Sequence, residues 1–430
     1  MNKKIFIFIF ITTFSFFLIS MEFELNVGNS FSNPLIVDID NDEVGEIIIA
    51  TEREAGAIRL IETDGTEVIT GLWPKNTGDM VYHTVNYYVK NNQKFLIYGE
   101  NTSDKCKIYS IDKDGQNSWE KEYNLIYIRT PASDIVTSKI YVTLTDPDNK
   151  KGLFSVLDYE GNEVFKKNYN AGISSSVVVE DINVNGRKEV IFRTNDGLVE
   201  AFDTSFTPLP GFPVKITDNT RECVSDIMVA DINGDRYKEI IVSSGFSGKQ
   251  SFFVINHKGE ITKTLTVSEK SITAPEVFDF DNDGTKEIII TTNDGKIFVK
   301  TLDNKDLQGW PVTAGSGSIP EVENPRKIIG KPVMLDIDGD GLTEILVAAL
   351  DGGEYKLKAY DIEGREKGSS ISLGKLAPFP LAEFFKLADL DKDGKYEIIY
   401  FEGELLKVKS LDFNNKIIIK DIHSNYIFNQ

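Results

Sequence analysis

Six short acidic segments carry the most informative chemistry in this sequence. The segment at residues 279–290 reads DFDNDGTKEIII, with carboxylates at its first, third, fifth and ninth positions before an aliphatic run. Carboxylate oxygens at this spacing suit calcium, which accepts six to eight oxygen ligands in a flexible geometry, whereas magnesium requires a strict octahedron and retains its water. Related segments, with Asp or Asn at positions three and five and Glu at position nine, begin at Asp38, Asp181, Asp231, Asp336 and Asp389.

The expected ligands are the side chains of positions one, three and five, the backbone carbonyl of position seven and the carboxylate of position nine. An EF-hand is excluded, because it needs a glutamate at position twelve and flanking helices. Position twelve is Ile290, Val347 or Tyr400 in three of the segments, and the flanks resemble strands. The predicted ligand residues of the six loops are Asp38, Asp40, Asp42, Val44 and Glu46; Asp181, Asn183, Asn185, Arg187 and Glu189; Asp231, Asn233, Asp235, Tyr237 and Glu239; Asp279, Asp281, Asp283, Thr285 and Glu287; Asp336, Asp338, Asp340, Leu342 and Glu344; and Asp389, Asp391, Asp393, Lys395 and Glu397.

Charge separates calcium loops from ordinary polar turns, which also favour Asp, Asn and Gly. Neighbouring carboxylates repel by about 1–4 kcal/mol per pair at surface-like dielectrics, so a metal-free turn would not choose four of them repeatedly. The loops hold 21 carboxylates, and the chain has a formal net charge of −20. We expect up to six calcium ions, with affinities of about 0.1–1 mM. The loop at Asp231 should be weaker because Arg236 replaces the glycine of position six, and the loop at Asp181 weakest because it has two charges.

The acidic segments mark a repeat of about 50 residues. Successive first aspartates from Asp181 to Asp389 are 50, 48, 57 and 53 residues apart, and the gap of 143 residues from Asp38 to Asp181 leaves room for two more units. Residues 85–115 and 133–161 keep the strand pattern of these units without the acids. Each unit offers four short strands rich in Val, Ile, Phe and Tyr. The sequence therefore predicts an all-β propeller of four-stranded antiparallel blades, with eight blades favoured over seven.

Two details of this propeller concern its outer strands. Residues 23–27 resemble a fourth strand and could complete the last blade, but the segment KIIIKDI from Lys416 competes for that role, and the sequence leaves both open. Four aromatic-proline pairs should mark fourth strands at a sheet edge, where proline is tolerated, and their rings should pack between blades. These pairs are Trp73-Pro74, Phe212-Pro213, Trp310-Pro311 and Phe379-Pro380.

The remaining composition limits the cellular setting. The excess of 67 acidic over 47 basic residues disfavours nucleic acid as a partner. Residues 1–20 contain two lysines and an apolar stretch that is short for a membrane span, which favours a signal peptide over the alternative, an uncleaved membrane anchor. We expect residues 21–430 to form one propeller domain that is secreted, on the cell surface or periplasmic, without stable membrane insertion after signal removal. Cys106 and Cys223 should be unpaired and buried, and the histidines at positions 83, 257 and 423 show no metal-ligand spacing.

The loops together with the strand pattern resemble the FG-GAP/VCBS repeat family, which includes the integrin α-subunit propeller, in an exported bacterial form. The resemblance covers nearly all of the chain after residue 20. It implies calcium bound by the hairpins that join first and second strands, with ligands usually on the opposite face. The chain departs from integrin-type loops in its Glu at position nine, where they usually carry Asp.

Two classes of function are compatible with these features. We favour a non-enzymatic binding or adhesion module for a glycan or an extracellular protein, with Arg221 and Arg326 as candidates for one ligand funnel. The alternative is a calcium-dependent polysaccharide lyase or another carbohydrate-active enzyme, since some pectin-degrading lyases resemble this chain in being eight-bladed calcium propellers. A lyase needs a placed base and an open metal position, and we assign no catalytic residue.

Overall fold

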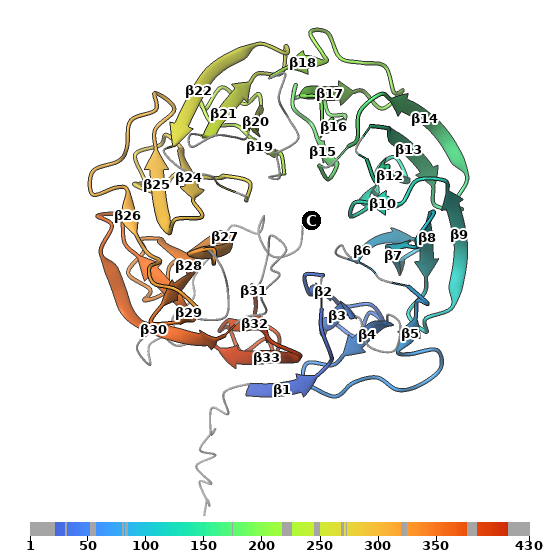
Figure 1. The fold of residues 1–430 in the computed structure, drawn as a ribbon, viewed down its shortest axis with the longest axis horizontal. Helices are drawn as coiled ribbons and strands as arrows, with labels where there is room; N and C mark the ends of the chain where they lie inside the picture. The colour runs from blue at the N-terminus through green and yellow to red at the C-terminus, as the bar shows by residue number, and fades with distance from the viewer. Residues whose placement is uncertain are drawn as a thin grey trace, which may run out of the picture.

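The chain folds into a ring of eight antiparallel sheets (Figure 1). The computed structural model describes residues 22–411, apart from 31, 52–56, 80, 82–84, 149, 174, 217–225, 245–249, 268–270, 272, 320–324 and 376–384. These residues contain strands and turns but no helix, and so none that could span a membrane. The all-β propeller and its eight blades are confirmed. The signal peptide expected at residues 1–20 lies outside the described residues.

The first four blades follow one another along the chain, with the first strand of each nearest the ring axis. Blade 3 has its inner strand in two pieces, β10 and β11, which both pair with β12. The strands are β2 (Leu35–Val37), β3 (Glu46–Thr51), β4 (Ala57–Ile61) and β5 (Lys75–Asn76) in blade 1; β6 (Asn86–Lys90), β7 (Gln93–Asn101), β8 (Cys106–Ile111) and β9 (Asn117–Tyr123) in blade 2; β10 (Tyr127–Ile128), β11 (Ala132–Asp134), β12 (Lys139–Thr145), β13 (Gly152–Asp158) and β14 (Glu163–Tyr169) in blade 3; and β15 (Val178–Glu180), β16 (Glu189–Arg193), β17 (Leu198–Phe202) and β18 (Val214–Lys215) in blade 4.

The last four blades repeat the pattern, except that the outer strand of blade 8 comes from the other end of the chain. The strands are β19 (Met228–Ala230), β20 (Glu239–Ser244), β21 (Gln250–Ile255) and β22 (Ile261–Val267) in blade 5; β23 (Glu276–Phe278), β24 (Glu287–Thr291), β25 (Lys296–Lys300) and β26 (Val312–Thr313) in blade 6; β27 (Ile328–Leu335), β28 (Glu344–Asp351), β29 (Glu354–Tyr360) and β30 (Glu366–Gly374) in blade 7; and β31 (Phe385–Ala388), β32 (Glu397–Glu402), β33 (Leu405–Ser410) and β1 (Glu22–Asn26) in blade 8.

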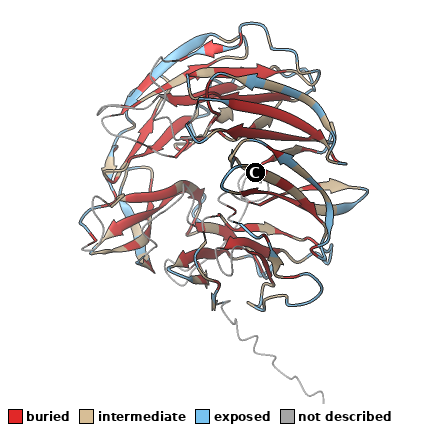
Figure 2. Cartoon of the chain, turned by 45° about the vertical axis from the view of Figure 1, so that its right-hand side comes forward, coloured by how far each residue is buried: buried red, intermediate tan, exposed pale blue. Residues whose placement is uncertain are grey.

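The aliphatic run after each acidic loop becomes the second strand, which is buried on both faces (Figure 2). Successive side chains of a strand point to opposite faces. Ile47 and Ile49 therefore pack against blade 8, while Ile48 and Ala50 pack against blade 2. The buried hydrophobic residues of the described chain form eight clusters, one at each boundary between neighbouring blades. No blade buries both of its faces alone.

A glycine turn between the third and fourth strands brings each blade close to the outer strand of the preceding one. A Cβ atom at Gly161 of blade 3 would lie 2.7 Å from Cδ2 of Trp119 in blade 2, a distance that real Cβ atoms do not adopt. Three further boundaries show the same approach, at Gly115 against Leu72, Gly259 against Gly211 and Gly364 against Val312. The glycines that end the third strands therefore allow the blades to stack tightly.

Strand β1 closes the ring in the same way. It pairs antiparallel with β33, and Phe23 lies opposite Val408. The ring of Phe23 lies against the turn of blade 1, where a Cβ at Gly65 would be 2.7 Å from its Cγ atom. The alternative that the sequence left open, closure by residues 416–422, involves residues outside the described part, and the outer position on β33 is taken by β1.

Three of the four aromatic-proline pairs lie directly before a short fourth strand, as expected. They precede β5, β18 and β26. The indole N–H of Trp73 donates to the carbonyl of Lys113 in blade 2 at 2.7 Å, and that of Trp310 donates to Ile362 in blade 7 at 3.0 Å. Packing between blades is thus confirmed for both tryptophans. The fourth pair was assigned wrongly: the outer strand of blade 7 is β30, which ends before Phe379 and Pro380, and these two residues lie outside the described chain.

Replacing Phe23 with alanine should weaken ring closure. The side chain is half-buried between blades 8 and 1, so its loss should lower the free energy of unfolding by about 1–2 kcal/mol. Thermal unfolding measures this. Glu24→Ala on the same strand is the control, because Glu24 is exposed and makes a surface ion pair with Lys407 worth about 0–1 kcal/mol. Equal effects of the two substitutions would contradict the closing role of Phe23.

Candidate metal-binding loops

All six acidic segments form hairpin loops between the first and second strands of a blade. Positions four and six have left-handed backbone conformations in every loop. Glycine adopts this conformation without cost, which explains its frequency at position six. Glu43 and Arg236 stand there in the other two loops with φ of 73° and 77°. Position six is therefore left-handed whether or not it is a glycine.

The glutamate of position nine has the same structural partner in each loop. One of its oxygens accepts the backbone N–H of position two, at 2.6–3.0 Å. The longer side chain of Glu, compared with Asp, is what crosses the loop to this N–H. The backbone N–H of position seven donates to the side chain of position five, at 2.7–2.9 Å. These bonds set the shape of the loop before any ion is considered.

Four loops bring at least three carboxylates together. Single oxygens of these residues all lie within 4.8 Å of one another. The side chains of positions one, three and nine meet in all four, and position five joins them within this distance in the first loop alone. The groups are Asp38, Asp40, Asp42 and Glu46; Asp279, Asp281 and Glu287; Asp336, Asp338 and Glu344; and Asp389, Asp391 and Glu397.

The loops at Asp279 and Asp389 leave a buried oxygen without a partner. Oδ2 of each aspartate accepts a backbone N–H, from Gly284 at 3.2 Å and from Gly394 at 3.1 Å. Oδ1 of each is buried and makes no hydrogen bond. A buried acceptor without a donor costs about 1–3 kcal/mol. Oxygen ligands around a cation would remove this cost, so the residues of these two loops fit calcium.

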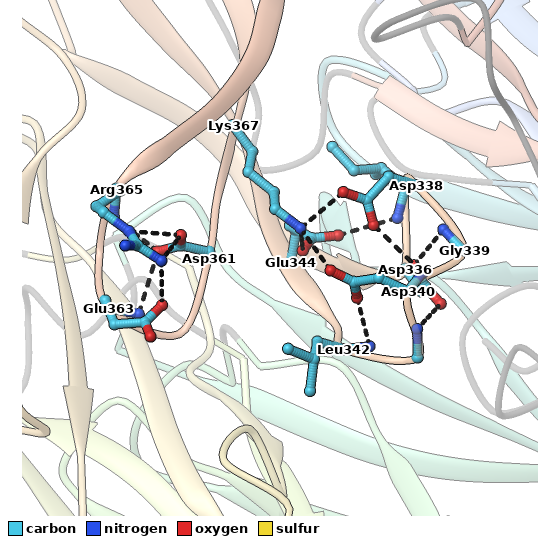
Figure 3. Close-up of polar contacts among 12 residues, drawn as sticks. Asp336, Asp338, Gly339, Asp340, Leu342, Glu344, Asp361, Glu363, Arg365 and Lys367 are labelled. Carbon is cyan, nitrogen blue, oxygen red and sulfur yellow. Dashed lines mark hydrogen bonds and ion pairs between the residues drawn. The ribbon is translucent and has the colours of Figure 1, made fainter.

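Lysine side chains enter two other loops. Lys94 of blade 2 donates to the backbone carbonyl of Asp38 and to Asn41 Oδ1, and its ammonium lies 3.3 Å from Asp38 Oδ2. Lys367 of β30 donates to three carboxylates of the Asp336 loop (Figure 3). In both loops a cation belonging to the protein therefore lies beside the acidic groups.

Asparagine amides fill the last two loops. Nδ2 of Asn183 donates to Glu189 at 2.9 Å, and Nδ2 of Asn233 donates to Glu239 at 3.1 Å. Neither loop brings three acids within 4.8 Å among the residues that the structure describes. Asn183 Oδ1 is buried without a partner, as Oδ1 of Asp279 and Asp389 is.

Carboxylate crowding changes the ionisation of the ninth-position glutamates. Burial, with added repulsion from neighbouring aspartates, raises the pKa of Glu46, Glu287 and Glu397 to about 7. Burial and repulsion also raise the pKa of Asp281 and Asp389. A bound cation would favour the charged forms of the same groups.

The other residues singled out in the sequence have simpler surroundings. Cys106 is buried and unpaired, as expected, and burial raises the pKa of its thiol to about 12. His257 stacks on Tyr237 with ring centroids 4.0 Å apart. Arg326 is half-buried, and the hydroxyl of Tyr355 donates to its carbonyl at 2.7 Å. Arg221, Cys223, His83 and His423 lie outside the described residues.

A pocket in blade 2 was missed by the sequence reasoning. Its volume is about 390 Å³, and it opens where the short β6–β7 turn replaces an acidic loop. Aromatic side chains line it, among them Phe95 and Trp119, and the Lys90–Glu160 ion pair of 2.8 Å stands at its wall. The signal was present in YYVKNNQKF, where a tight Asn-Asn turn joins two aromatic-rich strands.

The raised glutamate pKa values predict that the metal-free protein loses stability as the pH rises. These carboxyls titrate at their ordinary value of 4.5 when unfolded and at about 7 when folded, so the folded state binds more protons in this interval. Stability contributed by these groups must then fall as the pH increases through it. Melting temperatures in chelator measure this. Glu287→Gln should show a smaller decrease, and an unchanged pH dependence would contradict the assignment.

Comparisons with known proteins support the fold alone. No family model matches the chain, and no curated protein matches it, so the FG-GAP/VCBS resemblance stays a prediction. The structure is similar to the Dos1 propeller, with 14% identity, TM-score 0.58 and coverage of 93% of this chain and 96% of that one. It is similar to Sqt1 of Saccharomyces cerevisiae, with 12% identity, TM-score 0.59 and coverage of 91% and 98%. It is also similar to BBS1N crystallised with ARL6DN, with 11% identity, TM-score 0.51 and coverage of 93% and 99%. These solved structures and this chain share the propeller architecture.

Proposed function

We propose that this chain is an exported β-propeller that is stabilised by calcium in its hairpin loops and acts as a non-enzymatic binding module. The observation that carries the calcium part is the pair of buried, unpartnered oxygens on Asp279 and Asp389, each within a group of three carboxylates. Donors are absent from these two acceptors in the described structure, and a hard cation with oxygen ligands supplies what they lack.

Calcium would act here as a structural clamp between strands. The acids of positions one and three follow the first strand of a blade, and the Glu of position nine begins the second. An ion shared by these side chains ties the two inner strands together at one face of the ring. It would also counter the burial and the added repulsion that raise the pKa of Glu287 and Glu397. Export fits this role, because extracellular calcium is abundant enough for modules with affinities of about 0.1–1 mM.

The six loops should differ in affinity for reasons that the side-chain contacts supply. The loops at Asp279 and Asp389 rank first, because each keeps a buried aspartate oxygen without a partner. In the Asp389 loop, Lys395 pairs with Asp393 at 2.9 Å but leaves Oδ1 of Asp389 free of donors. The Asp38 loop ranks below them because calcium must compete with Lys94. The Asp231 loop follows, since an amide of Asn233 already bonds its ninth-position glutamate, and the Asp181 loop ranks last with two charges.

Calcium should raise the melting temperature, and Asp279→Asn should remove one bound ion. Saturation at 10–100 times the dissociation constant contributes about 1.4–2.7 kcal/mol per site. Equilibrium dialysis counts the ions, and thermal unfolding with calcium or chelator measures the stabilisation. Asp303→Asn is the matched control, because this exposed acid lies outside the loops and pairs with Lys263. An unchanged melting temperature in chelator would contradict structural calcium.

The blade 2 pocket is our candidate for the ligand site, and a glycan is the ligand that it fits best. This pocket lies at the β6–β7 turn, on the face of the acidic hairpins and not on the opposite face that the family resemblance implies. Trp119 is fixed by hydrogen bonds from its indole N–H to the carbonyl of Tyr159 at 3.1 Å and to the hydroxyl of Tyr88 at 3.2 Å. Aromatic faces offer apolar contact to a sugar ring. The exposed polar side chains of Asn91, Gln93 and Glu160 at the same pocket offer hydrogen bonds to hydroxyl groups. A few polar groups beside an aromatic surface are typical of small-ligand pockets.

A glycan array with the calcium-loaded protein tests the ligand assignment. Trp119→Ala should abolish binding, and Gln93→Ala should weaken it while leaving the melting temperature unchanged. Gln116→Ala is the control, since Gln116 is exposed on the same blade outside the pocket. Binding that survives both pocket substitutions would contradict this location. Unsaturated products released from a uronate polymer in calcium would favour the lyase alternative over a binding module.

A further inference from the structure

The Asp336 loop has the acids of a calcium site but already contains a cation. Nζ of Lys367 lies 2.7 Å from Asp338 Oδ2, 2.9 Å from Asp340 Oδ2 and 3.0 Å from Glu344 Oε1 (Figure 3). An ammonium has three donors, and each of them has one carboxylate acceptor here. These acceptors are positions three, five and nine, which are three of the four side chains expected to bind calcium.

The remaining oxygens of this loop are also satisfied. Asp336 accepts the backbone N–H groups of Gly339 at 2.7 Å and Gly341 at 2.9 Å. Oε2 of Glu344 accepts the N–H of Ile337 at 3.0 Å. In the described structure the loop therefore lacks the unpartnered aspartate oxygen found at Asp279 and Asp389. The Glu344 side chain is 0% exposed and that of Lys367 26%, so this ion pair is shielded from solvent and salt.

We infer that Lys367 is the resident cation of the Asp336 loop and takes the place of calcium there, so that blade 7 is held by the protein's own charge. This inference rests on the proposed calcium sites of the other loops. On this inference the Asp336 loop binds calcium less well than the other loops with four carboxylates, with which its sequence groups it.

The strand register accounts for part of the difference between the Asp336 loop and the loops at Asp279 and Asp389. Lys367 pairs with Ala359, which pairs with the residue two positions after Glu344. In blade 6 the equivalent outer position is Leu307. Its backbone N–H donates to the carbonyl of Val299, which pairs with Ile289, the residue two positions after Glu287. In blade 8 it is Phe23, which pairs with Val408. An apolar residue thus stands at both positions where blade 7 has a lysine. Blade 5 has Lys263 at this position, but its ammonium pairs with Asp303 of blade 6 at 2.7 Å and not with the Asp231 loop.

Exchanging these residues tests the inference. Lys367→Met keeps the length of the side chain without its charge, and the variant should bind one more calcium ion per chain than the unmodified protein in equilibrium dialysis. The reverse change, Leu307→Lys, should remove one ion from the Asp279 loop. Lys263→Met is the control, because its ammonium pairs with Asp303 away from the acidic loops. An unchanged ion count in Lys367→Met would overturn the inference. It would also be overturned if the single substitution Asp340→Asn lowered the number of bound calcium ions below that of the unmodified protein.

The test separates this inference from the proposed function. If the unmodified protein and Lys367→Met both bind no calcium, the calcium proposal fails. The cationic role of Lys367 is then measured by unfolding in chelator, where Lys367→Met leaves buried Glu344 without its partner. A melting temperature lower than that of Lys263→Met supports the role, and equal melting temperatures overturn it.

Discussion

The close contact between a glycine turn and the outer strand of the preceding blade is the interaction on which this ring depends. At Gly65 and Gly161 the aromatic side chains of Phe23 and Trp119 occupy the space that a Cβ atom would need. That approach brings the faces of adjacent sheets together, and the hydrophobic residues are consequently buried at the boundaries. Because each cluster needs two blades, stability is shared around the ring, and the last boundary matters as much as any other.

The acidic loops add a second constraint, which is how to neutralise crowded carboxylates. The backbone solution is common to all six, since the ninth-position glutamate accepts the same N–H in each. The groups that neutralise the carboxylates, in contrast, differ from loop to loop. Asn183 and Asn233 supply amides, Lys94 and Lys367 supply ammonium groups, and the loops at Asp279 and Asp389 are left with buried oxygens that have no donor. A repeated loop has thus become three kinds of site.

The propeller and the loops were predictable because their signals are local. Acids at alternate positions, glycine at position six and an aliphatic run all lie within twelve residues. The roles of Lys94 and Lys367 were not predictable, since each reaches a loop 20 or more residues away through strand register. Ring closure needed the structure for the same reason. The prediction that Phe379-Pro380 marks a fourth strand was drawn from the three other pairs, which do precede one. In blade 7 the fourth strand, β30, ends at Gly374, earlier in the sequence than this pair.

The pairing of β1 with β33 has a consequence for the order in which the protein is made. Glu22 leaves the ribosome long before Leu405, so the strand synthesised first must wait for the strand synthesised last. Blades 1 to 7 can assemble against one another as they emerge, but the boundary between blades 8 and 1 cannot form until nearly the whole chain is present. Such long-range contacts form slowly and leave edges exposed meanwhile. A chain of this design therefore completes its fold after synthesis rather than during it.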